Sequence, residues 1–195
     1  MRQPIDSIGT YVPTTSTLFL RNSNSPGLAD YAYGYGAPGY GLQPVSGDWD
    51  ANGTDTIGLY DKTTGNFFLR NSNSAGNADL TFQFGVGGVS IVPVTGDWDG
   101  NGTDTVGLFD NSQAVYFLRN SNSGGNADLT IFFGAAGAVP ITGDFDGNGT
   151  DTIAIYVPGS AVFFLRNSNT PGNADVTVNY GGLNLTPMMG DWDGQ

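Results

Sequence analysis

Short runs of β-branched and aromatic residues follow one another along the whole sequence, separated by Gly, Asn and Asp. Such runs, which show no helical period, predict strands joined by tight turns. Between residues 92 and 134 there are four of them, VPVTGDW, TVGLFD, VYFLRNS and DLTIFFG. We therefore expect four short strands in this segment and an all-β fold for the chain.

The pattern of this segment recurs through the sequence. An acidic stretch, an Arg within LRNSN and an Asp nine residues after that Arg mark each copy. The three sets are Asp48, Asp97, Asp144 and Asp191; Arg21, Arg70, Arg119 and Arg166; and Asp30, Asp79, Asp128 and Asp175. Four-stranded units of roughly 40–50 residues are typical of β-propellers. The sequence predicts one propeller domain over residues 1–195, with units at about 47–94, 96–141 and 143–188, and a composite unit of 189–195 plus 1–46.

The two ends of the sequence match two halves of one repeat. The chain starts with PIDSIGTY, which matches GTDTIGLY, and it stops at GDWDGQ, which matches GDWDGN. We expect the terminal pieces to complete one shared blade, which gives four blades per chain and removes two sheet edges. Closure between chains is the alternative: two copies could form eight blades, or a contact that does not close could form a filament.

Within each unit, the LRNSN segment predicts a hairpin. If Arg70 lies opposite Asp79, Phe67 meets Phe82 on one face of the hairpin. This register places the apolar side chains on one face and pairs opposite charges on the other.

Composition narrows the possible partners. The net charge is −12, yet only 12% of the residues are charged, and there is no His and no Cys. Twelve of the 18 acidic residues lie in the repeated acidic stretches, so the charge is local. A nucleic-acid partner is not expected, because no basic patch could neutralise phosphates. Membrane insertion is not expected either, because no apolar run has the length to span a bilayer.

The acidic stretch TGDWDGNGTDTVGLFD, residues 95–110, suggests a metal site. Counted from Asp97 as position 1, oxygen donors occur at positions 1, 3, 5 and 8, with Gly102 at position 6. Alternating oxygen donors before a Gly favour Ca²⁺. Without His or Cys, Zn²⁺ and copper are poor candidates. The alternative is that these Asp and Asn side chains only cap the turn. The candidate ligands are Asp48, Asp50, Asn52 and Asp55; Asp97, Asp99, Asn101 and Asp104; Asp144, Asp146, Asn148 and Asp151; and Asp191, Asp193, Gln195 and Asp6.

The stretch GDWDGNGTDT resembles the FG-GAP or VCBS-type repeat of integrin α-chain propellers and of many bacterial secreted proteins. The resemblance covers all four units. It implies a propeller whose loop between the first two strands of a blade binds Ca²⁺ through D-x-D-x-[DN]-G-x-x-D. The family's last Asp lies at position 9, where this chain has Thr56, Thr105, Thr152 and Ser7. The acidic residue stands one position earlier here, and the composite loop has Pro4 in place of the Gly.

Two other sets of repeated residues are candidate ligand-binding positions. Trp49, Trp98 and Trp192 follow the first Asp of the loop and could stack on sugars, although packing against the neighbouring blade is the favoured interpretation. Arg70, Arg119 and Arg166 could form a ring of polar contacts, although an Arg–Asp pair within each blade is favoured.

Catalysis is not expected. There is no His or Cys, and the carboxylate pairs that could hydrolyse glycosides all belong to the repeated loops. The expected function is a non-enzymatic, calcium-stabilised scaffold or binding module of an extracellular or cell-surface protein, with a role in adhesion or recognition. Its ligand would be a glycan or a protein. The alternatives are a glycan-binding propeller lectin and a self-assembling structural protein.

Overall fold

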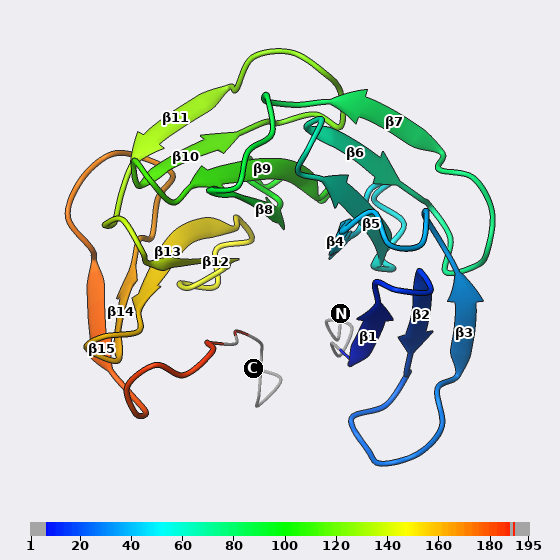
Figure 1. Ribbon diagram of the computed structural model, residues 1–195. Helices are drawn as coiled ribbons and strands as arrows, with labels where there is room; N and C mark the ends of the chain where they lie inside the picture. Colours follow the sequence, from blue (N-terminus) through cyan, green and yellow to red (C-terminus); the bar gives the residue numbers. More distant parts are fainter. Residues whose placement is uncertain (1–6, 188, 190–195) are drawn as a thin grey trace.

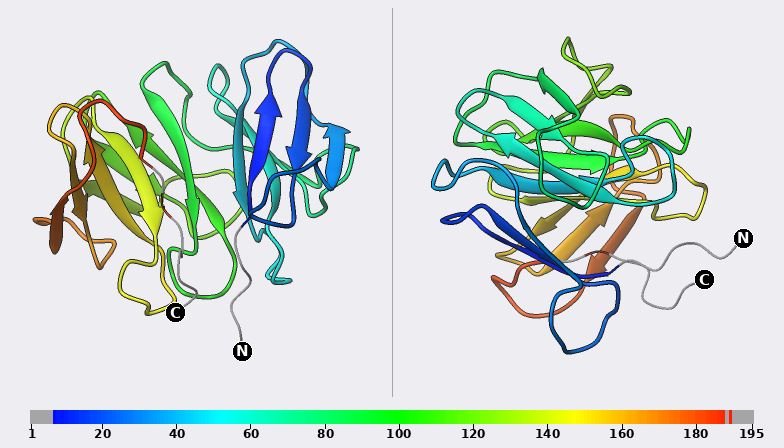
Figure 2. Two further views of the ribbon diagram at one scale, coloured as in Figure 1. Left: turned by 90° about the horizontal axis from the view of Figure 1, so that it is seen from below. Right: turned by 90° about the vertical axis from the view of Figure 1, so that its right-hand side faces the viewer.

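The computed structural model shows a four-bladed β-propeller, as the repeat predicts. The structure describes residues 7–187 and residue 189. All regular secondary structure in this part of the chain is β-strand, and it contains no helix long and apolar enough to cross a membrane. Figure 1 shows the blades arranged around a central axis, and Figure 2 shows them side-on.

The described chain forms fifteen strands. They are β1 (Gly9–Val12), β2 (Thr17–Leu20), β3 (Tyr31–Gly34), β4 (Gln43–Gly47), β5 (Thr56–Asp61), β6 (Asn66–Leu69), β7 (Leu80–Gln83), β8 (Ile91–Gly96), β9 (Thr105–Asp110), β10 (Val115–Leu118), β11 (Leu129–Phe132), β12 (Val139–Gly143), β13 (Thr152–Val157), β14 (Val162–Leu165) and β15 (Val176–Asn179).

The strands group into four antiparallel sheets in chain order. Blade 1 contains β1–β3, blade 2 contains β4–β7, blade 3 contains β8–β11 and blade 4 contains β12–β15. In blades 2 to 4 the first strand lies nearest the axis and the last lies at the periphery (Figure 1). The predicted fourth strand of blade 1, from the C-terminal end of the chain, falls mainly outside the described residues.

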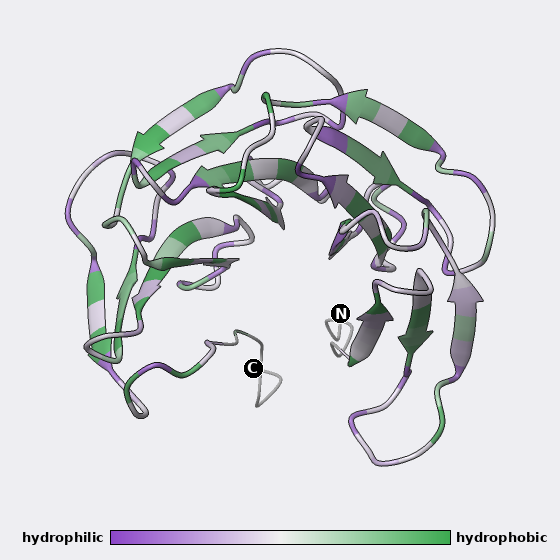
Figure 3. Ribbon diagram, viewed as in Figure 1, coloured by the Kyte–Doolittle hydropathy of each residue, from purple (hydrophilic) through white to green (hydrophobic). Residues whose placement is uncertain are grey.

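The predicted hairpin register is confirmed in blade 2. Phe67 lies opposite Phe82 in the pairing of β6 with β7. Phe67 is fully buried and also contacts Tyr60, with ring centroids 4.6 Å apart. Across the described chain, hydrophobic residues lie mainly on the strands, while the connecting loops are largely hydrophilic (Figure 3).

The core lies largely between adjacent blades. One buried cluster joins Trp49, Tyr60 and Phe67 of blade 2 to Val106 and Leu108 of blade 3. Equivalent clusters join blade 1 to blade 2 and blade 3 to blade 4. Burial of one face of a sheet against its neighbour is what stabilises a propeller blade.

Hydroxyl groups link the strands nearest the axis. The Thr95 hydroxyl on β8 donates to the Ser46 carbonyl on β4, and the Thr142 hydroxyl on β12 donates to the Thr95 carbonyl, both at 2.9 Å. The same side-chain position thus joins blade 2 to blade 3 and blade 3 to blade 4.

Candidate functional site

The acidic loops connect the first and second strands of blades 2, 3 and 4. In each loop the Asp at position 1 folds the turn by accepting two backbone N–H groups, from positions 5 and 6. The Asp97 carboxylate accepts from Asn101 at 3.0 Å and from Gly102 at 2.7 Å. Asp48 and Asp144 make the same pair of bonds in their loops. Capping of the turn, the alternative drawn from the sequence, therefore occurs at position 1.

In blades 3 and 4 the Asp at position 8 points away from its own loop and into the preceding blade. The Asp104 carboxylate accepts the Asp48 backbone N–H at 2.8 Å, and the Asp104 N–H donates to the Asp48 carbonyl at 2.9 Å. Asp151 makes the same two bonds to the backbone of Asp97. We call this pair of bonds the inter-blade contact. It joins position 8 of one loop to position 1 of the loop before it.

Glycine makes the inter-blade contact possible. A Cβ atom on Gly47 would lie 2.8 Å from the Asp104 Cβ, and one on Gly96 would lie 2.8 Å from the Asp151 Cβ. These distances are too short for real atoms, so Gly47 and Gly96 are needed for the blades to approach.

The inter-blade contact places carboxylates of different blades near one another. Burial raises the pKa of Asp104 to about 6; the bond from the Asp48 N–H opposes this rise, and repulsion from Asp151, Asp55 and Asp97 adds to it. Burial likewise raises the pKa of Asp151. The position-8 carboxylates thus carry an electrostatic cost at neutral pH.

The fit of the loops to a calcium ion is partial. Positions 1, 3 and 5 supply carboxylate and amide oxygens, the donors that suit a hard cation. The position-3 residues Asp50, Asp99 and Asp146 are exposed and make no hydrogen bond with the described part of the chain. Position 8, by contrast, is already bonded to the neighbouring blade. Within the described residues, no three acidic side chains are gathered closely enough to hold a metal ion.

Position 9, which holds the last ligand in the FG-GAP or VCBS-type repeat, has a structural role in this chain. Thr56, Thr105 and Thr152 are buried, and each hydroxyl donates to the carbonyl of the Gly of its own GDW or GDF sequence at 3.3–3.4 Å. At the position where the repeat it resembles has a metal ligand, this chain therefore has a Thr whose hydroxyl group hydrogen-bonds across the base of the loop.

The repeated arginines are bound within their own hairpins. Arg70 donates from Nε to the Ser74 carbonyl at 2.7 Å and from its terminal nitrogens to the Asn77 and Ala75 carbonyls at 2.5 and 3.0 Å. It also lies 3.8 Å from the Asp79 carboxylate. Arg21, Arg119 and Arg166 occupy equivalent positions, and their ion pairs with Asp30, Asp128 and Asp175 measure 4.0, 3.3 and 2.9 Å. The guanidinium groups hold the hairpin loops in shape.

The tryptophans lie in the interior. Trp49 and Trp98 are each only 4% exposed and belong to the clusters that join their blades to the next one. Their indole nitrogens donate to the Ile57 and Val106 carbonyls at 3.4 Å. This is the arrangement that the packing interpretation requires, and neither ring has a face open to a sugar.

Some of the predicted site residues lie outside the described part of the chain. They are Trp192 and the composite loop residues Asp191, Asp193, Gln195 and Asp6.

Sequence analysis missed the role of the second Asn in each RNSN segment. Asn73, Asn122 and Asn169 donate their side-chain amides to the carbonyls of the position-8 residues Asp55, Asp104 and Asp151, at 2.8–3.0 Å. The hairpin loop of each blade therefore supports the acidic loop of the same blade. The signal that could have indicated this role is the occurrence of the same Asn in every repeat.

No protein-family model matches the chain, and no curated protein or solved structure matches it.

Proposed function

We propose that this chain is a non-enzymatic binding module of an extracellular protein, of the FG-GAP or VCBS type, whose acidic loops bind calcium. One observation carries the proposal: three equivalent turns, each preshaped by the Asp at position 1, present an exposed carboxylate at position 3 beside an amide at position 5. A preformed turn with hard oxygen donors is the arrangement that calcium loops use. A calcium-stabilised scaffold suits a calcium-rich extracellular setting and a role in adhesion or recognition.

The composition and the bonding of the repeated charged groups motivate the non-enzymatic part of this proposal. The sequence contains no His and no Cys. Its repeated charged groups bond within the scaffold, as Arg70 and Asp104 do. Charged groups that are held in such bonds are not free to take part in acid–base chemistry.

Thermal unfolding in EDTA and then in excess Ca²⁺ tests the proposal. Binding to the folded state stabilises it by RT ln(1 + [L]/Kd), which is about 2.7 kcal/mol per site at a hundredfold excess over Kd. We expect a rise in Tm of many degrees that Mg²⁺ does not reproduce and that shrinks in Asp99→Asn, Asp50→Asn and Asp146→Asn variants. An unchanged Tm would contradict calcium binding and leave the loops as capped turns.

Self-assembly is a second candidate, which one observation favours. Tyr180, after β15 of blade 4, is 75% exposed, whereas the equivalent Phe84 and Phe133 of blades 2 and 3 are 2% and 7% exposed. Leu183 and Leu185, which follow it, are also exposed. Light scattering coupled to size-exclusion chromatography separates the possibilities: a mass of one chain at high concentration would argue against assembly.

A further inference from the structure

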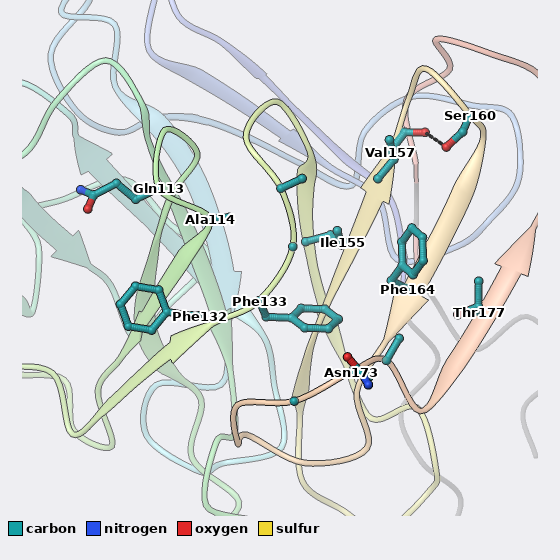
Figure 4. Close-up of a pocket in the computed structure, with 14 residues that line it drawn as sticks. Gln113, Ala114, Phe132, Phe133, Ile155, Val157, Ser160, Phe164, Asn173 and Thr177 are labelled. Carbon is teal, nitrogen blue, oxygen red and sulfur yellow. Dashed lines mark hydrogen bonds between the residues drawn. The ribbon is translucent and has the colours of Figure 1, made fainter.

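Each interface between two described blades is built from the same two faces. We call the face that a blade turns to the next blade its forward face, and the face that it turns to the blade before it its rear face. The forward face ends in an aromatic ring directly after the last strand, which is Tyr35, Phe84 or Phe133 in blades 1, 2 and 3. Figure 4 shows how the faces meet: Phe133 of blade 3 points towards Ile155 and Phe164 on the rear face of blade 4.

The forward face of blade 4 has no partner among the described residues. Its apolar cluster contains residues of blade 4 alone. Val178 lies opposite Phe163 in the pairing of β14 with β15, so both side chains belong to this face. Val178 is 42% exposed, whereas Ile131 at the equivalent position of blade 3 is 1% exposed. Tyr180, which takes the place of Phe133, is exposed as well.

The rear face of blade 1 is open in the same way. Ile8 is 59% exposed, whereas Val106 and Ile153 at the equivalent position of blades 3 and 4 are fully buried. Thr10 and Phe19, which lie opposite each other in the pairing of β1 with β2, complete this face and are exposed. The two open faces are therefore the two halves of the interface that joins the other blades.

The packing between blades opposes closure within one chain. Figure 1 shows the ring open between blade 4 and blade 1. To close it with the chain's own blades, each blade would have to turn further relative to the next. Gly47 lies so close to Asp104, and Gly96 to Asp151, that a Cβ atom would not fit, and close-packed contacts of this kind do not deform freely. A second copy can meet both open faces without changing the existing interfaces.

The number of open faces sets the number of copies. Each chain offers one forward face and one rear face, so two chains can bury all of them by closing one ring. With four blades from each chain, this ring has eight blades. Propellers typically have about four to eight blades, and a third chain would exceed that range.

We propose that a second copy of this chain docks its blade 1 onto blade 4 of the first, and that the two copies close one ring. This interface gives the self-assembly candidate its surface and its partner. It rests on that candidate and does not depend on calcium binding.

Size-exclusion chromatography with light scattering, and sedimentation at several concentrations, test the proposal. We expect the mass of two chains. Val178→Asp on the forward face and Ile8→Asp on the rear face should each raise the dissociation constant at least about hundredfold, because the new carboxylate loses its hydration in an apolar interface. Thr10→Leu, which restores the leucine of blades 2 and 3, should lower it about tenfold. Val86→Asp is the matched control: Val86 is 89% exposed, lies in blade 2 outside both faces, and should leave the constant unchanged.

Mixing the two disrupted variants identifies the interface. Val178→Asp keeps an intact rear face and Ile8→Asp keeps an intact forward face, so an equimolar mixture should recover pairs that neither variant forms alone. Recovery also shows that both variants are folded. A contact between two blade 4 faces would be insensitive to Ile8→Asp and would not be recovered by mixing, and either result would overturn the proposal.

The remaining outcomes separate this interface from the functions proposed above. A parent mass of one chain at high concentration would overturn both the interface and the self-assembly candidate. A larger mass that neither disrupted variant lowers would overturn the interface and leave self-assembly standing. A mass that grows beyond two chains would overturn closure by two copies. Equal masses in EDTA and in Ca²⁺, together with an unchanged Tm, would contradict calcium binding and sustain the interface.

Discussion

Replacement of Asp104 by Asn separates the two effects of the inter-blade contact. Asn keeps an oxygen that can accept the Asp48 N–H, now bonded at 2.8 Å, but it cannot ionise. Burial raises the pKa of Asp104 from 3.8 to about 6. Between these two values the folded protein binds more protons than the unfolded chain, so this group lowers the free energy of unfolding as the pH rises from about 4 to about 6. The variant should therefore be more stable than the parent at neutral pH.

The size of the gain follows from the pKa. A difference of about 2 in pKa corresponds to about 3 kcal/mol. Because Asp104 is partly exposed, screening by solvent reduces the expected gain to about 1–2 kcal/mol. For a chain of this size the Tm should rise by about 2–8 °C at neutral pH and by little near pH 4.

Urea and thermal unfolding in EDTA, at neutral pH and near pH 4, measure this effect. Asp99→Asn is the control: it removes the same charge from an exposed position and should change stability by less than about 0.5 kcal/mol. Asp104→Ala leaves the Asp48 N–H without its acceptor and should be about 1–3 kcal/mol less stable than Asp104→Asn. A destabilised Asp104→Asn at neutral pH, or a pH dependence equal to the parent's, would refute the reasoning.

Three further variants or sites give independent tests. Phe67→Ala should lower the free energy of unfolding in urea by about 3–5 kcal/mol, because the ring is fully buried; a loss under about 1 kcal/mol would contradict that packing. Arg166→Lys should lower it by about 1–2 kcal/mol, because lysine cannot reach the Thr170 and Asn173 carbonyls together. Asn52 should deamidate faster than Asn101 and Asn148. The side-chain oxygens of Asn101 and Asn148 each accept the backbone N–H two residues later, which holds the side chain in place, whereas no described residue makes this bond with Asn52. Peptide mapping after incubation at alkaline pH measures the three rates, and equal rates would contradict the last prediction.

The blades and the hairpin register could be predicted because both depend on contacts within one repeat. The pairing of Phe67 with Phe82 follows from a short loop and from alternation of side chains between two faces. Those rules need only the local sequence. The burial of Trp49 could be anticipated in the same way, because every blade must pack against the next.

The direction of the position-8 side chain could not be predicted. Numbering along the loop places Asp104 beside the other donors of its own turn, yet its carboxylate bonds to the backbone of the blade before it. Side chains alternate between faces where a strand begins, so a shift of one residue changes the partner. Only the packing of one blade on another shows which partner is present.

The cost carried by Asp104 bears directly on the calcium proposal. An Asn in place of Asp104 would keep the hydrogen bond from the Asp48 N–H and would remove the repulsion from the carboxylates of Asp151 and Asp55. An Asp is therefore the better residue only when positive charge lies close to it. A cation bound at positions 1, 3 and 5 of the neighbouring loop would supply that charge, because Asp48 belongs to both the loop and the inter-blade contact. If the loops bind calcium, the stability gained by Asp104→Asn in EDTA should shrink or reverse in excess Ca²⁺. If the gain is the same in both, the carboxylate serves only the scaffold, and no cation binds within its electrostatic reach.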